Sequence, residues 1–254
     1  MGALVIVATP IGNLSDISPR ALDALRSADL IACEDTRQTL KLLNHFGIQK
    51  PLVSYHDFNE AKKASELGEK IRAGMKVALV SDAGTPGISD PGYRLVRYCR
   101  EQGLNVNVIP GPNAAVAALS ASGLPSDEFF FVGFLPSKKS ARREKLESLR
   151  SLRATLIFYE APHRIEGTLI DLLEILGDRE TCLARELTKI HEEFLFGKLS
   201  EIRGKVKALG EFVIVLAGNA DADQPSPNAP LTRDQVLKSL GISRNELYDL
   251  FFKK

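Results

Sequence analysis

The chain has 254 residues, of which 44% are hydrophobic and 26% charged, and its formal net charge is +1. This composition is typical of a globular, soluble protein and excludes one that binds polyanions through its overall charge. No run approaches the roughly 18 apolar residues of a membrane helix, and no secretion signal precedes the first strand-like run. We therefore expect a cytoplasmic protein without a membrane segment.

The three cysteines, Cys33, Cys99 and Cys182, lie far apart in apolar contexts. Their spacing matches no metal-binding pattern, so they predict reduced core residues, and we expect no metal site.

Apolar runs alternate with helical patterns through the first 112 residues. The apolar runs predict strands at 3–8, 28–33, 51–55, 76–80 and 105–109. Helices are expected between them. Ser18 and Pro19 fit the N-cap and first turn of one helix, and Leu40, Leu43 and Phe46 form the apolar stripe of the next. Strands that alternate with helices predict βα units and a mostly parallel sheet.

Polar clusters follow four of these strands. They are Thr9–Asn13, Glu34–Arg37, His56–Glu60 and Ser81–Asp90. The carboxyl ends of parallel strands meet at one edge of a sheet, where ligands of α/β proteins bind. The sequence therefore predicts a single site built from distant segments.

The longest of these loops, Ser81–Gly92, is rich in Gly, Pro, Ser and Asp. Its glycines let a ligand approach the backbone, and its prolines restrict the loop before any ligand binds. Asp82 and Asp90 offer carboxylates to a ribose hydroxyl, an amino group or a cation. The loop lacks the glycine patterns of phosphate-binding loops. The alternative, a structural turn, is disfavoured because twelve residues is long for that role.

The second half begins after Pro110-Gly-Pro112 with a helix rich in small residues. Strands are expected at 129–134, 154–159, 181–184, 192–196 and 211–217, with a regular amphipathic helix at 165–176. We expect Phe129–Phe131 and Phe134 to lie in the core. The predicted domains are 1–112 and 113–220, followed by a linker at 221–230 and a small helical tail at 231–254.

The segment Lys138–Arg153 is locally basic, with seven basic and two acidic residues. One interpretation is a solvated helix with internal ion pairs. The other is a surface that binds RNA phosphates, through Lys138, Lys139, Arg142 and Arg143. Charge alone does not decide between them.

Eight motifs in a fixed order carry a family resemblance that covers about residues 3–217. They are Val7-Ala-Thr-Pro-Ile-Gly-Asn-Leu14, Glu34-Asp-Thr-Arg37, Leu79-Val-Ser-Asp-Ala-Gly-Thr-Pro86, Ser89-Asp-Pro-Gly92, Pro110-Gly-Pro112, Gly133-Phe-Leu-Pro136, Phe158-Tyr-Glu-Ala-Pro-His-Arg164 and Ala184-Arg-Glu-Leu-Thr-Lys189. Together they closely resemble the bacterial ribosomal RNA small subunit methyltransferase I family, which has the tetrapyrrole-methylase fold.

The resemblance implies two α/β domains, the first with a parallel-rich sheet and the second with a mixed one, and a cofactor cleft between them. It further implies a homodimer that uses S-adenosylmethionine to methylate the ribose 2′-oxygen of a cytidine in 16S rRNA, free or in the small ribosomal subunit. The cofactor contacts implied for this sequence are Pro10, Asp82, Ala83, Gly84, Thr85, Ile88, Asn113, Ala114, Tyr159, Ala161, Ala184, Leu187 and Glu211.

Three positions depart from the family pattern. His56-Asp-Phe-Asn-Glu60 has one histidine where the family usually has two, and Leu209 stands where the family has lysine. Asn113 replaces a serine after the Pro-Gly-Pro motif. The single histidine weakens the expectation that a histidine pair acts after the third strand.

Methyl transfer to a ribose hydroxyl requires alignment and help in removing the hydroxyl proton. Candidates for the base are Glu34, Asp35, His56, Glu60 and Glu192. We expect Asp35, Arg37, His56 and Lys189 to form the substrate side of the site. The alternatives are that Asp35 caps the next helix while Arg37 pairs with Glu34, and that His56 only satisfies loop carbonyls.

Two other functions remain open at this point. One is methylation of a tetrapyrrole, which would not need the basic segment. The other is a non-catalytic RNA-binding or ribosome-assembly module, against which the Asp82–Gly92 loop argues.

Overall fold

Short runs of Val, Ile, Leu and Ala form the first sheet of the computed structural model, which describes residues 2–220. Its strands are β1 (Ala3–Val7), β2 (Leu30–Cys33), β3 (Leu52–Ser54), β4 (Lys76–Val80) and β5 (Asn105–Ile109). All neighbours pair in parallel, in the order β3-β2-β4-β1-β5. The carboxyl ends of β1, β2 and β4 are therefore adjacent, as the polar clusters predicted.

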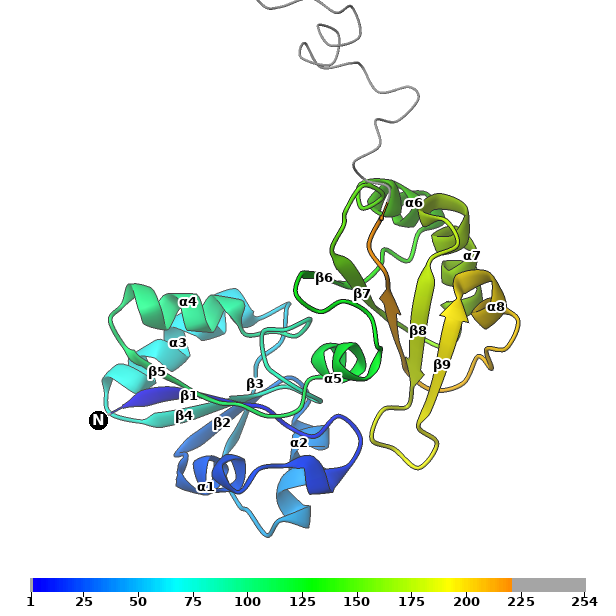
Figure 1. Ribbon diagram of the computed structural model, residues 1–254. Helices are drawn as coiled ribbons and strands as arrows, with labels where there is room; N and C mark the ends of the chain where they lie inside the picture. The colour runs from blue at the N-terminus through cyan, green and yellow to red at the C-terminus, as the bar shows by residue number, and fades with distance from the viewer. Residues whose placement is uncertain (1, 221–254) are drawn as a thin grey trace, which may run out of the picture.

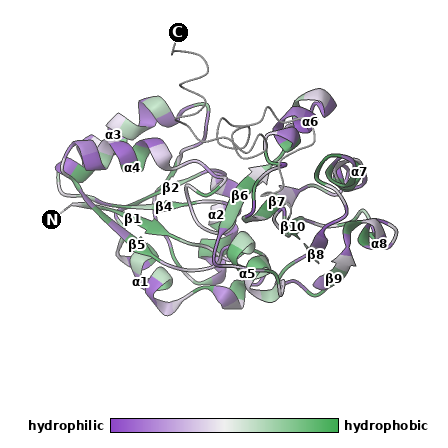
Figure 2. Ribbon diagram, turned by 45° about the horizontal axis from the view of Figure 1, so that its top comes forward, coloured by the Kyte–Doolittle hydropathy of each residue, from purple (hydrophilic) through white to green (hydrophobic). Residues whose placement is uncertain are grey.

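Helices cover both faces of this sheet. They are α1 (Pro19–Ser27), α2 (Thr36–His45), α3 (Glu60–Arg72) and α4 (Tyr93–Glu101), with a short 3-10 helix, η1 (Leu14–Asp16), after β1. Buried side chains of α1 and α2 pack on one face, and those of α3 and α4 pack on the other. In Figure 2 the strands are mainly hydrophobic, whereas α3 and α4 carry many hydrophilic residues.

The second sheet lies beside the first (Figure 1). It contains β6 (Phe129–Phe134), β7 (Thr155–Glu160), β8 (Glu180–Arg185), β9 (Glu193–Lys198) and β10 (Phe212–Leu216), in the order β6-β7-β10-β8-β9. Only β6 and β7 pair in parallel, so the sheet is mixed, as expected. One face packs on α5 (Ala114–Ala121); the other packs on α6 (Lys139–Glu147), α7 (Ile165–Leu176) and α8 (Leu199–Arg203).

Most predicted elements are present, with ends within a few residues of those expected. The basic helix is shorter than expected, because it ends at Glu147. Leu40 was predicted to lie in the apolar stripe of α2, but it is exposed, and Thr39 and Leu43 are buried instead.

The prediction that the phenylalanines of β6 lie in the core is wrong for three of them. Phe129, Phe130 and Phe134 keep 43–57% of their surface exposed. Because β6 is an edge strand with only β7 beside it, its side chains are incompletely covered. The predicted linker and helical tail lie outside the described residues, and the boundary at residue 112 stays a prediction.

The cysteines are buried and free, as the sequence predicted. None of the helices between residues 2 and 220 has both the length and the apolar character needed to span a membrane. Within the same range no group of three or more His, Cys, Asp or Glu side chains is arranged to hold a metal ion.

Candidate functional site

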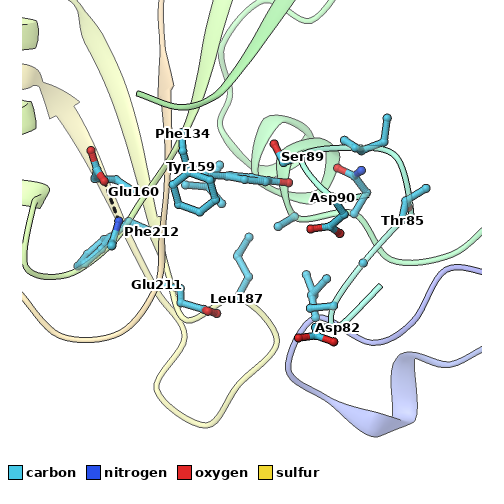
Figure 3. Close-up of a pocket in the computed structure, with 18 of the residues that line it drawn as sticks. Asp82, Thr85, Ser89, Asp90, Phe134, Tyr159, Glu160, Leu187, Glu211 and Phe212 are labelled. Atoms are coloured by element: carbon cyan, nitrogen blue, oxygen red, sulfur yellow. Dashed lines mark hydrogen bonds between the residues drawn. The ribbon is translucent and has the colours of Figure 1, made fainter. Parts of the chain in front are cut away.

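A cavity of about 350 Å³ lies between the two domains. Its volume is within the range of about 300–1,000 Å³ that small-molecule sites occupy. It is lined by Ile11, Asp82, Ala83, Gly84, Thr85, Ile88, Ser89, Asp90, Asn113, Ala114, Phe134, Tyr159, Glu160, Ala161, Pro162, Leu187, Lys189, Glu211, Phe212 and Val213. Figure 3 shows the loop after β4 as one wall and residues of the second domain as the other.

The loop after β4 is fixed by its neighbours in the first sheet. Thr9 and Gly84 exchange two backbone hydrogen bonds, with N···O distances of 2.8 and 3.1 Å. Gly84 has φ +81°, a conformation that glycine adopts without strain. The Thr85 hydroxyl donates to the Pro112 carbonyl at 3.0 Å. These bonds shape the wall before any ligand binds.

The second wall joins the end of β7 to the start of α5. The Tyr159 hydroxyl accepts a hydrogen bond from the Ala115 N–H at 3.1 Å. The Asn113 side chain caps α5 by accepting from the Val116 N–H at 3.1 Å. Asn113 therefore supplies the same capping function as the serine that it replaces in the family pattern.

Lys189 connects the two domains at one end of the cavity. Its ammonium donates to Glu186 at 2.9 Å and to Glu211 at 2.8 Å. Its alkyl chain fills the space beside Gly12, where an added Cβ would lie 2.5 Å from the Lys189 Cγ. Glu186 has φ +51° and Thr188 has φ +65°, which are uncommon values for residues with side chains. This strained backbone sets the direction of the lysine.

Carboxylates gather where the loops after β2, β3 and β4 meet. Burial raises the pKa of Glu34 to about 7, and the charges of Asp82, Asp90, Asp57 and Asp35 add to this effect. Burial likewise raises the pKa of Asp90 to about 6, against the lowering effect of the Ser81 hydroxyl. Of these groups, Asp82 and Asp90 line the cavity. The arrangement favours a ligand that carries positive charge and no phosphate.

The residues predicted to contact a cofactor mostly meet at this cavity. All of them line it except Pro10, which is buried next to Ile11, and Ala184, which is buried in the core beneath it. The contacts of each residue with a cofactor remain predictions.

The predicted substrate residues do not form one group. Asp35 caps α2 by accepting from the Arg37 N–H at 2.8 Å, and its carboxylate pairs with the Arg37 guanidinium at 2.6 Å. The capping interpretation of Asp35 is therefore confirmed, and the predicted pairing of Arg37 with Glu34 is wrong. Hydrogen bonds from Arg37 lower the pKa of Asp35 to about 2, which makes it a weak base.

His56 lies outside the lining of the cavity, whereas Lys189 forms part of it. The His56 Nε2 is 3.2 Å from the Asn59 side-chain amide, and its buried Nδ1 has no hydrogen-bond partner within residues 2–220. The expectation that this histidine satisfies loop carbonyls is thus not met.

The basic segment divides into buried and exposed parts. Arg142 is buried and pairs with Asp171 at 2.6 Å. Arg143 pairs with the same carboxylate at 2.7 Å and with Glu174 at 2.6 Å. The prediction that Arg142 binds RNA is corrected, because its guanidinium is used to hold α6 against α7. Lys138 and Lys139 are exposed at the start of α6.

Several lining residues were missing from the predicted site. Ser89 and Asp90 belong to a loop that the sequence singled out, but the resemblance did not select them. Phe134 was assigned to the core because apolar residues of a strand are usually buried. Ile11, Glu160, Pro162 and Phe212 lie next to predicted positions, and Val213 lies two residues after the predicted Glu211. A single sequence contains no signal that distinguishes an exposed aromatic residue at the end of an edge strand from a buried one.

Comparisons with known proteins identify the chain. Residues 3–203 match the family model of tetrapyrrole (corrin/porphyrin) methylases. A ribosomal RNA small subunit methyltransferase I from Thermotoga maritima is 51% identical over 86% of this chain and 99% of its own length. The protein of the same name from Escherichia coli O157:H7 is 50% identical over 97% of this chain and 86% of its own length.

Solved structures show the same fold at lower identity. A diphthine synthase has a TM-score of 0.65 at 18% identity and covers 85% of this chain and 90% of its own. A Thermus thermophilus uroporphyrin-III C-methyltransferase complexed with S-adenosyl homocysteine has a TM-score of 0.57 at 21% identity, with coverages of 85% and 97%. The two-domain α/β fold and the close relatives agree: the chain belongs to the tetrapyrrole methylase family and, within it, to the ribosomal RNA small subunit methyltransferase I family.

Proposed function

We propose that the protein transfers the methyl group of S-adenosylmethionine to the ribose 2′-oxygen of a cytidine in 16S rRNA. The observation that carries this proposal is the preformed cavity in a chain about half identical to proteins named ribosomal RNA small subunit methyltransferase I. A tetrapyrrole methylase is disfavoured by those relatives. A non-catalytic assembly module would have no use for such a cavity.

The residues of the cavity suit this cofactor. When bound, S-adenosylmethionine supplies a methyl group on a positively charged sulfonium, together with an ammonium group and no phosphate. Asp82 provides negative charge on one wall. The loop also lacks the glycine pattern that would bind phosphates. Ile88, Ala114, Leu187 and Val213 provide apolar surface for an adenosine.

Exposed basic and aromatic side chains mark a route for RNA. Phe134 lines the cavity at the end of β6 and keeps 57% of its surface exposed. Lys138 and Lys139 follow at the start of α6, and neither has an ion pair within the described part of the chain. Aromatic rings stack on unpaired bases and lysines bind phosphates, so this combination suits a single-stranded RNA segment.

The test is methyl transfer from radiolabelled S-adenosylmethionine to naked 16S rRNA and to assembled small subunits. A methylated ribose 2′-oxygen cannot take part in alkaline cleavage, so the modified nucleotide resists hydrolysis and can be mapped. We expect label at a cytidine with this resistance. Label on a base, or no label on either substrate while the folded protein binds the cofactor, would contradict the proposal.

Replacing Lys138 and Lys139 with glutamate should weaken RNA binding and leave cofactor binding unchanged. For every RNA phosphate that the lysines no longer neutralise, the slope of log K against log salt concentration should fall by about 1. The measurement is RNA binding at several salt concentrations, with cofactor binding by calorimetry. Lys145→Glu, the same type of charge reversal at the far end of α6, is the matched control. A similar effect of Lys145→Glu would indicate a general charge effect instead.

We also propose that the protein is a homodimer, as the family resemblance implies. Ile190 and Phe58 are almost completely exposed, and such apolar side chains are suited to contacts between copies. Sedimentation equilibrium decides the matter, because a concentration-independent monomer mass would exclude the dimer.

A further inference from the structure

A base is needed at the ribose hydroxyl, and the side chains proposed from the sequence are poorly placed to supply it. Glu34, Asp35, His56, Glu60 and Glu192 all lie outside the lining of the cavity. Asp35 is held by Arg37, Glu60 by Arg94, and Glu192 by the Thr188 N–H. A general base must lie within hydrogen-bond reach of the proton that it removes. None of these residues faces the space where substrate and cofactor would meet.

Asp90 does face that space. Figure 3 shows its carboxylate directed toward the gap between the loop after β4 and the second-domain wall that carries Tyr159 and Phe134. Its position is defined by its neighbour: Ser89 has φ +62°, and an added Cβ on Gly133 would lie 2.8 Å from the Ser89 hydroxyl oxygen. The turn at Ser89 thus packs closely against β6.

The same end of the cavity is where RNA would arrive. Gly133, which packs on Ser89, immediately precedes the exposed ring of Phe134, and Lys138 and Lys139 follow. Glu211, to which Lys189 donates a hydrogen bond, lies away from Ser89 and Phe134, toward Leu187 (Figure 3). A nucleotide whose base stacks on Phe134 would therefore bring its ribose next to Asp90.

We propose that Asp90 is the general base of methyl transfer, which makes this inference rest on the proposed function. The ribose 2′-oxygen attacks the methyl carbon of the sulfonium, and a C–O bond forms while the C–S bond breaks. The sulfur keeps the electron pair of that bond and becomes a neutral thioether. The 2′-hydroxyl proton passes to a carboxylate oxygen of Asp90 and then to solvent.

The surroundings of Asp90 support this assignment. The titratable groups that interact with it electrostatically are Asp82 from its own loop, Asp57 from the loop after β3, Glu34 at the end of β2, and the Tyr159 hydroxyl from β7, and the Ser81 hydroxyl is its hydrogen-bond partner. Burial and the aspartate charges raise the pKa of Asp90 to about 6, so its carboxylate holds a proton more strongly than an exposed one. Since the base must be deprotonated to act, kcat should rise with pH through this region and level off above it.

Glu34 has a different role in this arrangement. Its pKa is raised to about 7, but its carboxylate does not line the cavity. Because Glu34 holds its proton to a higher pH than Asp90, it is largely neutral where Asp90 titrates, and the charges that raise the pKa of Asp90 are those of Asp82 and Asp57. Asp57 lies outside the lining of the cavity, so Asp57→Asn should shift the acid limb of the kcat profile to lower pH, while the base itself remains.

The experiment compares Asp90→Asn, Glu34→Gln, Asp57→Asn and the wild type in methyl transfer to small subunits, as pH profiles of kcat. We expect Asp90→Asn to lower kcat roughly 100- to 10,000-fold and to keep the calorimetric Kd for S-adenosylmethionine within about threefold. We expect Glu34→Gln to retain most of its kcat and its acid limb, and Asp57→Asn to retain its kcat at high pH and to move the acid limb downward. Thermal unfolding of each variant checks that it is folded.

Three results would overturn the assignment. They are near-wild-type kcat in Asp90→Asn, a cofactor Kd raised in proportion to the lost activity, and loss of the acid limb in Glu34→Gln. If Asp90→Asn does not fold, the Asp57→Asn profile decides, since an unshifted acid limb contradicts the coupling of Asp57 to Asp90. A wild-type protein that methylates no rRNA would instead refute the proposed function, which separates the two failures.

Discussion

We expect Asp171→Asn to lower the free energy of unfolding by about 3–5 kcal/mol, because it leaves a buried guanidinium without its counter-charge. The Arg142 side chain is 9% exposed and that of Asp171 only 1%. Asp171 accepts from the Arg142 Nε at 2.7 Å and from the Arg143 Nη1 at 2.7 Å. Urea unfolding followed by far-ultraviolet circular dichroism measures the loss.

Two controls define the cause of that loss. Glu174→Gln removes the other carboxylate that pairs with Arg143, but this residue is exposed, so a change below about 1 kcal/mol is expected. The double variant Arg142→Met with Asp171→Leu removes both buried charges and should regain much of the stability. A loss in Asp171→Asn no larger than that in Glu174→Gln would contradict the buried-pair interpretation.

The positions of the strands could be predicted because their signals are local. Each run of Val, Ile, Leu or Ala is bounded by Gly, Pro or polar residues, so β1, β4 and β7 were located almost to the residue. The convergence of the loops after β1 and β4 also followed, since adjacent parallel strands bring their carboxyl ends together. The backbone bridge between Thr9 and Gly84 joins these two loops.

What could not be predicted depends on packing between distant segments. Arg142 and Asp171 are 29 residues apart, and only the contact of α6 with α7 turns two ordinary charges into a buried pair. Phe134 is exposed because β6 is an edge strand, which the strand order alone determines. Asp35 and Asp90 both follow predicted strands. The Asp35 carboxylate is engaged in capping α2, whereas the turn at Ser89 places the Asp90 carboxylate at the cavity.

The charge of Asp82 is expected to be a principal determinant of cofactor affinity. Asp82→Asn should raise the Kd for S-adenosylmethionine about 10- to 100-fold, because a charge-assisted hydrogen bond contributes about 1.5–3 kcal/mol and 1.4 kcal/mol is tenfold in Kd. The substitution preserves the local structure, since an asparagine oxygen can still accept from the Asp35 N–H, now bonded to the carboxylate at 3.0 Å. Isothermal titration calorimetry measures the change.

Asp57→Asn provides the matched control for Asp82. Asp57 belongs to the same group of carboxylates, and its charge contributes to the raised pKa values of Glu34 and Asp90, but unlike Asp82 it lies outside the lining of the cavity. It should change the Kd less than about threefold, because its charge acts on the cofactor only from a distance, where solvent screens it. Equal losses in the two variants would show that the cofactor responds only to the summed negative charge of the loops. A loss confined to Asp82→Asn would place a positively charged group of the cofactor against this side chain.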